Sequence, residues 1–575
     1  MHWARPSALW PARLLALVVA LLVTGPALAP GFVLLRDMVF VPRQDVDLDA
    51  LGLGGALPRA VPVDAFMGLL TAVVPGAWAQ KILLIAAIYL AVLGAARLVP
   101  PDADGRRGAA AGVAGLVYGW SPYVAERLLI GHWSLLLGFA ALPWIARAAV
   151  LLRTGAPGAL PRLVLACAPA ALTPTGALLA GGVVLAVVGR RRAIQAGAVV
   201  LVLALPWVVA GALQPHAGVS DPAGVPAFAA RGEGWGGPLL SALGTGGLWD
   251  ADAVPASRTS VLVPLITVVL LALAGWGWAS GGVRQGPLRG LLPLGVLGVL
   301  LACAGTIPGV VDLLETAVHT VPGAGLLRDG QKWTAWWALA LALGAGLGAR
   351  RLAERASGRL GPTAGRVLAV GALLLPVVAL PDLAWGVGGR LEPVQYPADW
   401  QRVRAVLATD RHPGDVLVLP FGAYRVFAWN DDRLQLDPAP RWLPRPTVTD
   451  DTLVVSGSVV TGEDQRARAA GAAAGDPARL ARMGIGWVLV ERGTPGRPVP
   501  AAVSALPLVV DGPALDLYRV PGAVRPPGPA PVRVTLVVVA HACALGAVAA
   551  AALWILWRPS TVTLRRRPLR KRVKE

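Results

Sequence analysis

Apolar residues fill this chain in runs long enough to cross a lipid bilayer. About 20 consecutive apolar residues in a helix span the hydrocarbon core. The segment 163–189 is broken at Thr173-Pro174-Thr175, and because proline removes a helix hydrogen bond, it predicts a hairpin of two short half-spanning helices. The pattern predicts a mainly α-helical, polytopic membrane bundle of about twelve helices. The other spans are 13–35, 79–99, 108–125, 133–152, 194–214, 260–282, 290–308, 332–350, 366–387 and 534–557.

The pattern changes between residues 388 and 532, where apolar runs shorten and charges of both signs alternate. Asp399 to Ala408 places apolar residues on one helical face, and 477–483 predicts a second helix. Short apolar strands are expected at 415–420, 486–491 and 515–520. This order of elements predicts a small α/β domain. The expected regions are 1–387 (a polytopic membrane domain with a long first outer loop, 36–78), 388–532 (the α/β domain), 533–557 (a last membrane helix) and 558–575 (a basic tail).

Charge is sparse and strongly one-sided. Only 15% of residues are charged, the formal net charge is +19 and the mean hydropathy is +0.61, which excludes an ordinary soluble enzyme. With the N-terminus in the cytoplasm, the cytoplasmic segments carry 26 Lys and Arg against 4 Asp and Glu. This bias follows the positive-inside rule and places both termini in the cytoplasm and the α/β domain outside. A nucleic-acid partner is therefore not expected, because the basic residues lie beside spans rather than on a folded basic domain.

Three polar clusters at the predicted outer ends of spans are candidates for chemistry. The first is Arg36-Asp37, which we expect directly after the first span. A carboxylate held there can act as a general base on a sugar hydroxyl, so Asp37 is the first catalytic candidate; the alternative is a plain ion pair with Arg36. Asp45, Asp47 and Asp49 alternate and are expected to form a solvated face. Asp64 is expected to cap a helix and is a secondary site candidate.

The second cluster contains Glu126, Arg127 and His132. Ionisable residues at membrane depth are costly and are functional candidates by default. Arg127 can bind a lipid phosphate through two hydrogen bonds, and His132 can donate a further one. The alternative is a structural ion pair between Arg127 and Glu126, which makes Glu126 a secondary candidate.

The third cluster holds Arg328 and Lys332 beside a predicted helix start. Cations at a helix N-terminus can bind the phosphate of a lipid carrier. The alternative is snorkelling of Lys332 within a belt of tryptophans at 333, 336 and 337. No Cys and His residues have the spacing of a zinc site, and we expect neither a metal nor another cofactor.

In its architecture the sequence resembles the GT-C superfamily of integral membrane glycosyltransferases. The resemblance lies in the number of spans, the long first outer loop with Asp37 near its start, the cations in other outer loops and the C-terminal outer domain. The stretch from Ser121-Pro122-Tyr123 to Leu142-Pro143-Trp144 is similar to actinobacterial arabinofuranosyl- and mannosyltransferases of the cell envelope. Paired acids are frequent in that family's first loop, whereas Asp37 here follows Arg36.

The resemblance implies a multi-pass enzyme of a bacterial plasma membrane. Its donor would be a polyprenyl-phosphate-linked sugar and its acceptor an envelope glycan or lipid, with transfer on the extracytoplasmic side and inversion at the anomeric carbon. It implies that Asp37 is the base and that Arg36, Arg127, His132, Arg328 and Lys332 bind the donor phosphate. Two alternatives remain from the residues alone. One is a transporter or flippase of a lipid-linked envelope precursor, and the other is a non-catalytic envelope scaffold.

Overall fold

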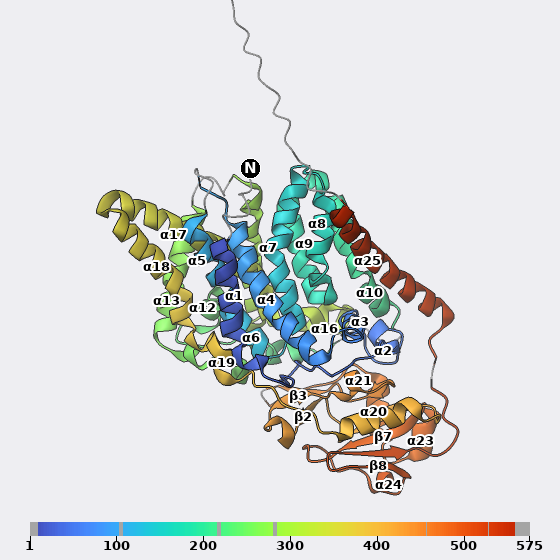
Figure 1. Ribbon diagram of the computed structural model, residues 1–575. Coiled ribbons are helices and arrows are strands. Elements are labelled where there is room, and N and C mark those ends of the chain that lie inside the picture. The colour runs from blue at the N-terminus through green and yellow to red at the C-terminus, as the bar shows by residue number, and fades with distance from the viewer. Residues whose placement is uncertain are drawn as a thin grey trace, which may run out of the picture.

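The chain folds into a helical membrane domain with an α/β domain against one end (Figure 1). The computed structural model describes residues 10–102, 107–214, 220–279, 285–455, 457–526 and 528–557. The expected basic tail, 558–575, lies outside these residues. Helix α1 begins, and the long helix α25 ends, on the side of the molecule away from the α/β domain (Figure 1).

Seven helices in the described part of the chain are long and apolar enough to cross a membrane, so this is a membrane protein. The predicted number of twelve is not confirmed. Two further apolar helices, α9 (Pro174–Val188) and α13 (Leu262–Trp278), are shorter. The seven are α1 with its 3₁₀ extension (Trp10–Leu28), α4 (Gly76–Leu98), α7 (Trp133–Arg153), α10 with a preceding 3₁₀ turn (Arg190–Ala212), α15 (Leu291–Cys303) with flanking turns (Pro287–Thr306), α18 (Pro362–Ala379) and α25 (Pro531–Trp557).

Helix α17 (Thr334–Leu360) is the centre of the bundle. It packs against α5 (Gly108–Gly119), α13, α15 and α18, and its first sixteen residues are all buried. The tryptophans at 333, 336 and 337 are buried with them, so the expected interfacial belt is not formed. The remaining short helices are α2 (Leu48–Leu51), α3 (Val63–Thr71), α6 (Pro122–Leu129), α8 (Ala159–Cys167), α11 (Gly224–Ala227), α12 (Gly237–Leu243), α16 (Val310–Thr320) and α19 (Ala384–Gly389).

Proline and its neighbours end helices at three positions that matter here. The hairpin break expected at Thr173-Pro174 is present, and the Thr173 hydroxyl accepts a hydrogen bond from the Gly176 N–H at 3.0 Å to cap α9. The expected span 108–125 stops at Gly119, since Ser121 caps the separate helix α6 and Pro122 is its first residue. The first span ends early too: α1 (Trp10–Thr24) passes into a 3₁₀ turn at Gly25-Pro26, and this turn ends at Leu28 rather than at residue 35.

The small α/β domain near the C-terminus is confirmed, and its core lies on both faces of a five-stranded sheet. The strand order is β4-β1-β7-β9-β8; β4, β1 and β7 are parallel, and β9 runs antiparallel to both of its neighbours, β7 and β8. Val416 and Val418 of β1 pack toward α20 (Asp399–Thr409), whereas Leu417 and Leu419 pack toward α22 (Gln465–Ala472) and α23 (Pro477–Arg482). Burial on both faces is why the predicted strands are continuously apolar.

The strands of this sheet are β1 (Asp415–Leu419), β4 (Thr447–Val448), β7 (Ile485–Glu491), β8 (Leu508–Asp511) and β9 (Leu515–Arg519). Two small hairpins are formed by β2 (Tyr424–Val426) with β3 (Leu434–Leu436) and by β5 (Leu453–Val455) with β6 (Ser458–Val460). The short helices α21 (Ala439–Trp442) and α24 (Ala501–Ser504) complete the domain.

The first loop joins the two domains along a line of contacts that we call the seam. Phe32 and Val394 exchange backbone hydrogen bonds at 2.9 Å, and the Tyr396 hydroxyl donates to the Phe40 carbonyl at 3.0 Å. Val41 is buried within the apolar core of the α/β domain. The seam therefore fixes the loop against the α/β domain by backbone bonds and apolar packing, in addition to charged pairs.

Candidate active site

A tight turn at the seam presents Asp37. Leu35 and Met38 exchange backbone hydrogen bonds at 3.2 and 2.9 Å, so Arg36 and Asp37 are the two central residues of the turn. Arg36 has φ +47°, which residues with a side chain seldom adopt. Its N–H donates to the Leu434 carbonyl at 2.6 Å, and its carbonyl accepts from the Leu436 N–H at 2.8 Å. Strand β3 of the α/β domain therefore holds the turn in this conformation.

This geometry corrects the expected position of Asp37. It does not follow a rigid helix directly, because α1 and its extension end at Leu28. Phe32, Leu35 and Arg36 form isolated β-bridges after it, and the Asp37 N–H donates to the Ile130 carbonyl at 3.1 Å. Asp37 is therefore positioned by backbone hydrogen bonds to β3 on one side of the turn and to Ile130 on the other, and not by the end of a helix.

Gly131 allows the turn to approach the segment between α6 and α7. It has φ +85°, and a Cβ added there would lie 2.1 Å from the Met38 nitrogen and 2.7 Å from the Asp37 nitrogen. Only glycine fits both the left-handed conformation and this close backbone contact. Gly131 therefore brings Asp37 next to His132.

The Asp37 carboxylate is held by one residue from each domain. His132 Nε2 lies 3.0 Å from Oδ2, and the Tyr424 hydroxyl donates to Oδ1. The Asp37 side chain is still 34% exposed. Burial alone would raise the pKa of Asp37, but the hydrogen bond and charge of His132, with the bond from Tyr424, hold that pKa below its ordinary value. Asp37 is thus a carboxylate at neutral pH.

Arg127 contacts the second ring nitrogen of His132 and thereby fixes the tautomer of this ring. Arg127 Nη1 lies 2.8 Å from His132 Nδ1, and since a guanidinium can only donate, Nδ1 accepts. The proton of neutral His132 is therefore on Nε2, from which it is donated to Asp37. Burial, together with the charge of Arg127, lowers the pKa of His132, so the ring is neutral at pH 7.

Arg127 is fully buried at the centre of this network. Its guanidinium donates to both carboxylate oxygens of Asp329, at 3.0 and 3.3 Å, and to the Gln331 side chain. Lys332 Nζ lies 3.4 Å from the same Asp329, and the Lys332 side chain is 22% exposed. Burial would raise the pKa of Asp329, but Arg127 and Lys332 lower it well below its usual range. Among the residues that the structure describes, the anticipated ion pair of Arg127 with Glu126 is not formed; Gln331 bonds to both side chains instead.

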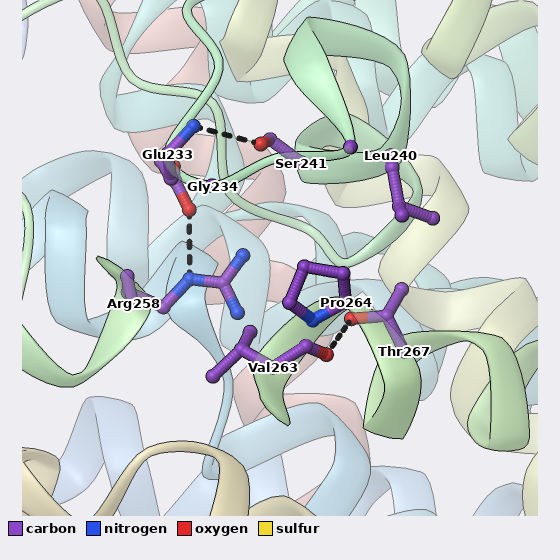
Figure 2. Close-up of a pocket in the computed structure, with 9 residues that line it drawn as sticks. Glu233, Gly234, Leu240, Ser241, Arg258, Val263, Pro264 and Thr267 are labelled. Carbon is purple, nitrogen blue, oxygen red and sulfur yellow. Dashed lines mark hydrogen bonds and ion pairs between the residues drawn. The ribbon is translucent and has the colours of Figure 1, made fainter. Parts of the chain in front are cut away.

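Glu126 belongs to a second buried set of charges behind Gln331. Gln331 Nε2 donates to Glu126 Oε2 at 3.1 Å, and both Glu126 and Glu233 face Gly246. Glu233 accepts from Arg258 at 2.7 Å beside a small cavity, and its N–H donates to Ser241 (Figure 2). Burial, and then the charge of Glu233, raise the pKa of Glu126 well above its usual value. Burial and Glu233 thus favour the protonated form of Glu126, whereas Glu233 is paired with Arg258.

Three other sequence candidates lie apart from this network and are paired elsewhere along the seam. Arg36 turns away from Asp37 and pairs with Asp250 at 2.8 Å. Arg328 lies 3.4 Å from Glu463 of the α/β domain, with its guanidinium over the Phe228 ring. Asp64 is not the cap of α3, whose preceding residue is Pro62; it lies in the first turn and pairs with Arg441 at 3.2 Å.

The alternating acids of the first loop do not form a solvated face either. Asp47 caps α2 by accepting from the Ala50 N–H at 2.8 Å, and Asp45 pairs with Arg404. Asp49 accepts from the Ala56 N–H at 3.2 Å. Burial, followed by the charge of Asp47, raises the pKa of Asp49 to about 7. These residues fold the loop and attach it to the α/β domain.

Several residues of the network are missed by sequence reasoning. Asp329 and Gln331 stand between the two selected cations and carry a signal, since both are polar residues at a helix start. Tyr424 has no comparable signal, because its link to Asp37 crosses 387 positions and two domains.

Comparisons with known proteins agree with this architecture. No protein-family model matches the sequence, and no curated protein is significantly similar to it. Among solved structures, the chain is similar to the cryo-EM structure of arabinofuranosyltransferase AftD from Mycobacteria, with a TM-score of 0.56 and 17% identity over 91% of this chain. A mutant of AftD gives a TM-score of 0.55 and 15% identity over the same share.

The predicted resemblance to actinobacterial glycosyltransferases of the GT-C type is therefore confirmed as a likeness of fold. This chain spans 40% of the length of AftD in the first comparison and 42% in the second. The shared part includes most of the membrane domain and the α/β domain, since 91% of this chain is matched.

Proposed function

We propose that this protein is a membrane glycosyltransferase that transfers a sugar from a polyprenyl-phosphate donor to an envelope glycan or lipid. One observation carries the proposal. On a fold shared with an arabinofuranosyltransferase, an ionised and partly exposed carboxylate, Asp37, is held at the junction of the membrane and α/β domains. A base at this position can meet an acceptor from the aqueous side and a lipid donor from the membrane side.

Asp37 acts as the general base. Its Oδ1 accepts the proton of the acceptor hydroxyl while that oxygen attacks the anomeric carbon of the donor, and the bond from this carbon to the phosphate oxygen breaks. Direct displacement inverts the anomeric centre, and the electron pair leaves with the polyprenyl phosphate. Tyr424 donates a hydrogen bond to the same Oδ1, so its hydroxyl occupies the place that the acceptor hydroxyl takes.

His132, Arg127 and Asp329 position this base. Arg127 keeps the His132 proton on Nε2, and Asp329 holds Arg127 through two hydrogen bonds. In this arrangement Arg127 is a positioning residue rather than a ligand of the donor phosphate, because its guanidinium is buried and already paired with protein groups. Proton transfer to a general base that is positioned in this way accelerates a reaction by about 10²- to 10⁴-fold.

Lys332 is the residue we assign to the donor phosphate. Its ammonium is partly exposed and lies beside the network, where it can bind phosphate oxygens and stabilise the charge of the leaving group. Arg328 and Arg36 are paired with Glu463 and Asp250, which supports a role in the seam instead. The residues of the network perform proton transfer and charge stabilisation without a cofactor in this scheme.

We place the transfer on the extracytoplasmic side of the membrane. The positive-inside bias supports this orientation, and α1 begins on the face away from the α/β domain (Figure 1). Asp37 then faces the compartment in which envelope acceptors are found.

The test is transfer by Asp37→Asn, measured with purified polyprenyl-phosphate-linked pentoses and hexoses and envelope acceptors. We expect a loss of about 10²-fold or more in kcat. Asp431→Asn is the matched control, because the Asp431 side chain is 72% exposed and its φ of +52° suits asparagine. Transfer by Asp37→Asn at the wild-type rate would refute Asp37 as the base. Movement of the lipid-linked sugar across the membrane without transfer would favour the transporter alternative.

A further inference from the structure

Helix α16 carries an apolar stripe that is exposed beside the face with which the helix packs on the protein. On the packed face Val318 is buried, and its carbonyl accepts a hydrogen bond from the Ser220 N–H at 3.1 Å. Leu313, Ala317 and Val321 follow one another at intervals of four residues and therefore share a different face. Leu313 is 68% exposed and Val321 is 53% exposed, so the structure leaves this apolar stripe largely uncovered.

A polar stripe runs along the other side of α16. Asp312, Thr316 and His319 are exposed and follow one another at intervals of four and three residues. The Thr316 hydroxyl donates back to the Asp312 carbonyl at 2.8 Å, which leaves the Asp312 carboxylate and the His319 ring to face the surroundings. A helix with an exposed apolar stripe and an exposed polar stripe is typical of helices that lie at a membrane surface.

The apolar stripe of α16 continues the lipid-facing surface of the span that precedes it. Val296, Leu297 and Leu300 of α15 are exposed large apolar residues, as expected where a membrane helix faces lipid. Ile307 comes directly after this span and is exposed as well, and α16 begins three residues later, at Val310. Exposed apolar surface therefore continues along the chain from the span into α16.

The end of the same span lies beside the segment that carries Lys332. A Cβ added to Gly330 would lie 2.7 Å from the Leu301 carbonyl oxygen, so the last turns of α15 contact the chain two residues before Lys332. Helix α16 leads on to this segment through a 3₁₀ turn at Ala324–Leu327, and it lies in the part of the bundle nearest the α/β domain (Figure 1). The level at which α15 leaves the membrane is therefore also the level of Lys332.

The size of the apolar stripe favours lipid over a protein partner. The distance along the helix from Leu313 to Val321 is about 12 Å, at 1.5 Å per residue. A stable protein interface buries about 800 Å² on each partner, which is far more than one stripe of this length offers. A helix at a membrane surface needs no such area, because the same bilayer already surrounds the spans beside it.

We propose that α16 docks on the surface of the bilayer on the side of the α/β domain, with Leu313, Ala317 and Val321 in the lipid and Asp312 and His319 in water. The docked helix holds the segment from Arg328 to Lys332 at the level of the lipid phosphates. A lipid-linked phosphate then reaches Lys332 from within the leaflet. Docking on lipid is independent of the proposed function, whereas the link to Lys332 rests on it.

The test measures the depth of α16 in the full-length protein, in nanodiscs of phosphatidylcholine. The native cysteines at 167, 303 and 543 are replaced by alanine, and a nitroxide label is attached to one of Leu313→Cys, Ala317→Cys, Asp312→Cys or His319→Cys. Collisions with oxygen, which is enriched in lipid, and with a water-soluble nickel chelate give the depth of each label. We expect the labels at 313 and 317 about 5–10 Å deep, at the boundary of headgroups and acyl chains, and those at 312 and 319 in water.

Two reference labels and one pair of variants complete the measurement. Leu300→Cys in α15 reports lipid, and Asp431→Cys in the α/β domain reports water. Leu313→Glu should move the label at Ala317 out of the lipid by about 5–10 Å, because a carboxylate is costly among acyl chains. Thr316→Glu is the matched control, since it adds the same charge to the polar stripe and should leave the depth of that label unchanged.

Three results would overturn the docking of α16. If the labels at 313 and 312 collide equally with the nickel chelate, the helix lies in water. If the label at 313 is protected from both oxygen and the chelate, a second copy or a partner protein covers the stripe. If Leu313→Glu leaves the label at 317 at its original depth, the apolar stripe does not hold the helix.

Transfer assays separate the docking of α16 from the proposed function. With a polyprenyl-phosphate-linked donor, Leu313→Glu should raise KM severalfold and leave kcat unchanged. A short-chain, water-soluble analogue of the donor should have the same KM with Leu313→Glu and with wild type, because it does not enter from the leaflet. A wild-type protein without transfer activity refutes the proposed function, and the depth measurement still decides the docking. A docked helix whose release leaves the KM of the lipid donor unchanged refutes the link to Lys332 alone.

Discussion

Replacing Arg127 with methionine tests the buried network most directly. The Arg127 side chain has no exposed surface, and its guanidinium is bonded to Asp329, Gln331 and His132. Arg127→Met leaves the Asp329 carboxylate, itself only 9% exposed, with Lys332 at 3.4 Å as its remaining cation. Removing one partner of a buried ion pair costs about 3–5 kcal/mol, because the other charge stays buried without compensation. We expect Arg127→Met to lower the free energy of unfolding by about this amount.

The double variant Arg127→Met/Asp329→Asn separates the structural effect from the functional one. Neutralising Asp329 removes the unpaired charge, so the double variant should recover about 1–3 kcal/mol relative to Arg127→Met alone. Sugar transfer should not recover, because His132 still lacks the donor that keeps its proton on Nε2. The prediction is therefore a rescue of stability without a rescue of kcat.

The assay is denaturant unfolding in mild detergent, monitored by tryptophan fluorescence, together with transfer rates for the same preparations. Asp511→Asn is the control, since Asp511 and Arg492 form a pair whose side chains are 69% and 46% exposed, and Arg492 keeps its second partner, Asp516, at 2.7 Å. Exposed pairs contribute about 0–1 kcal/mol, so this variant should be nearly neutral. A double variant no more stable than Arg127→Met would refute the buried-charge argument. Recovery of transfer along with stability would refute the positioning role.

Further predictions concern single residues. Glu126→Gln should change the free energy of unfolding by less than about 1 kcal/mol, because burial and Glu233 favour the neutral form of Glu126. Glu233→Gln should cost about 3 kcal/mol by leaving Arg258 without its paired carboxylate, and equal effects would contradict this assignment. Gly131→Ala should reduce both stability and transfer, since its Cβ would displace the Asp37 turn, and wild-type transfer would contradict that contact. Asp49 has a folded-state pKa of about 7 against an ordinary value of 3.8, so its ionisation progressively opposes folding as pH rises between these values. Asp49→Asn should therefore raise the unfolding temperature relative to wild type more at about pH 7.5 than at about pH 4.5, and a constant difference would contradict the raised pKa.

The elements with a regular apolar period could be predicted from the sequence. Helix α20 and strands β1, β7 and β9 lie within a residue or two of their expected positions, because their burial follows from local spacing. The end of the first span was predicted wrongly. Residues 31–35 are as apolar as a membrane helix, but they form no helix: the backbone of Phe32 bonds to Val394 and that of Val33 to the Gln80 side chain. Apolar composition reports burial and does not distinguish a helix in lipid from a strand buried between domains.

Most residues of the candidate site could be selected from the sequence, but the contacts between them could not. Asp37, Arg127, His132 and Lys332 could be selected because ionisable residues near apolar helices are costly. That they meet through Asp329 depends on contacts between residues about 200 positions apart. Local sequence offers adjacent partners instead, such as Arg36 for Asp37 and Glu126 for Arg127, and in neither case is the adjacent pair the one that forms.

The charges of the folded site indicate which cation is available to bind the phosphate of the donor. The sequence offers several cations on the side of the α/β domain, and most of them are neutralised by an acid that folding brings from a distance: Asp250 for Arg36, Asp329 for Arg127 and Glu463 for Arg328. Lys332 shares Asp329 with Arg127, so these two cations and one carboxylate carry a local net charge of +1, which the ionised Asp37 on the other side of the neutral His132 balances. An incoming phosphate is attracted by this remaining charge, and Lys332 is the cation of the group with exposed surface. The local positive charge at Lys332 is therefore a property of the assembled network, and Lys332→Gln should remove donor binding while leaving the buried pair of Arg127 and Asp329 in place.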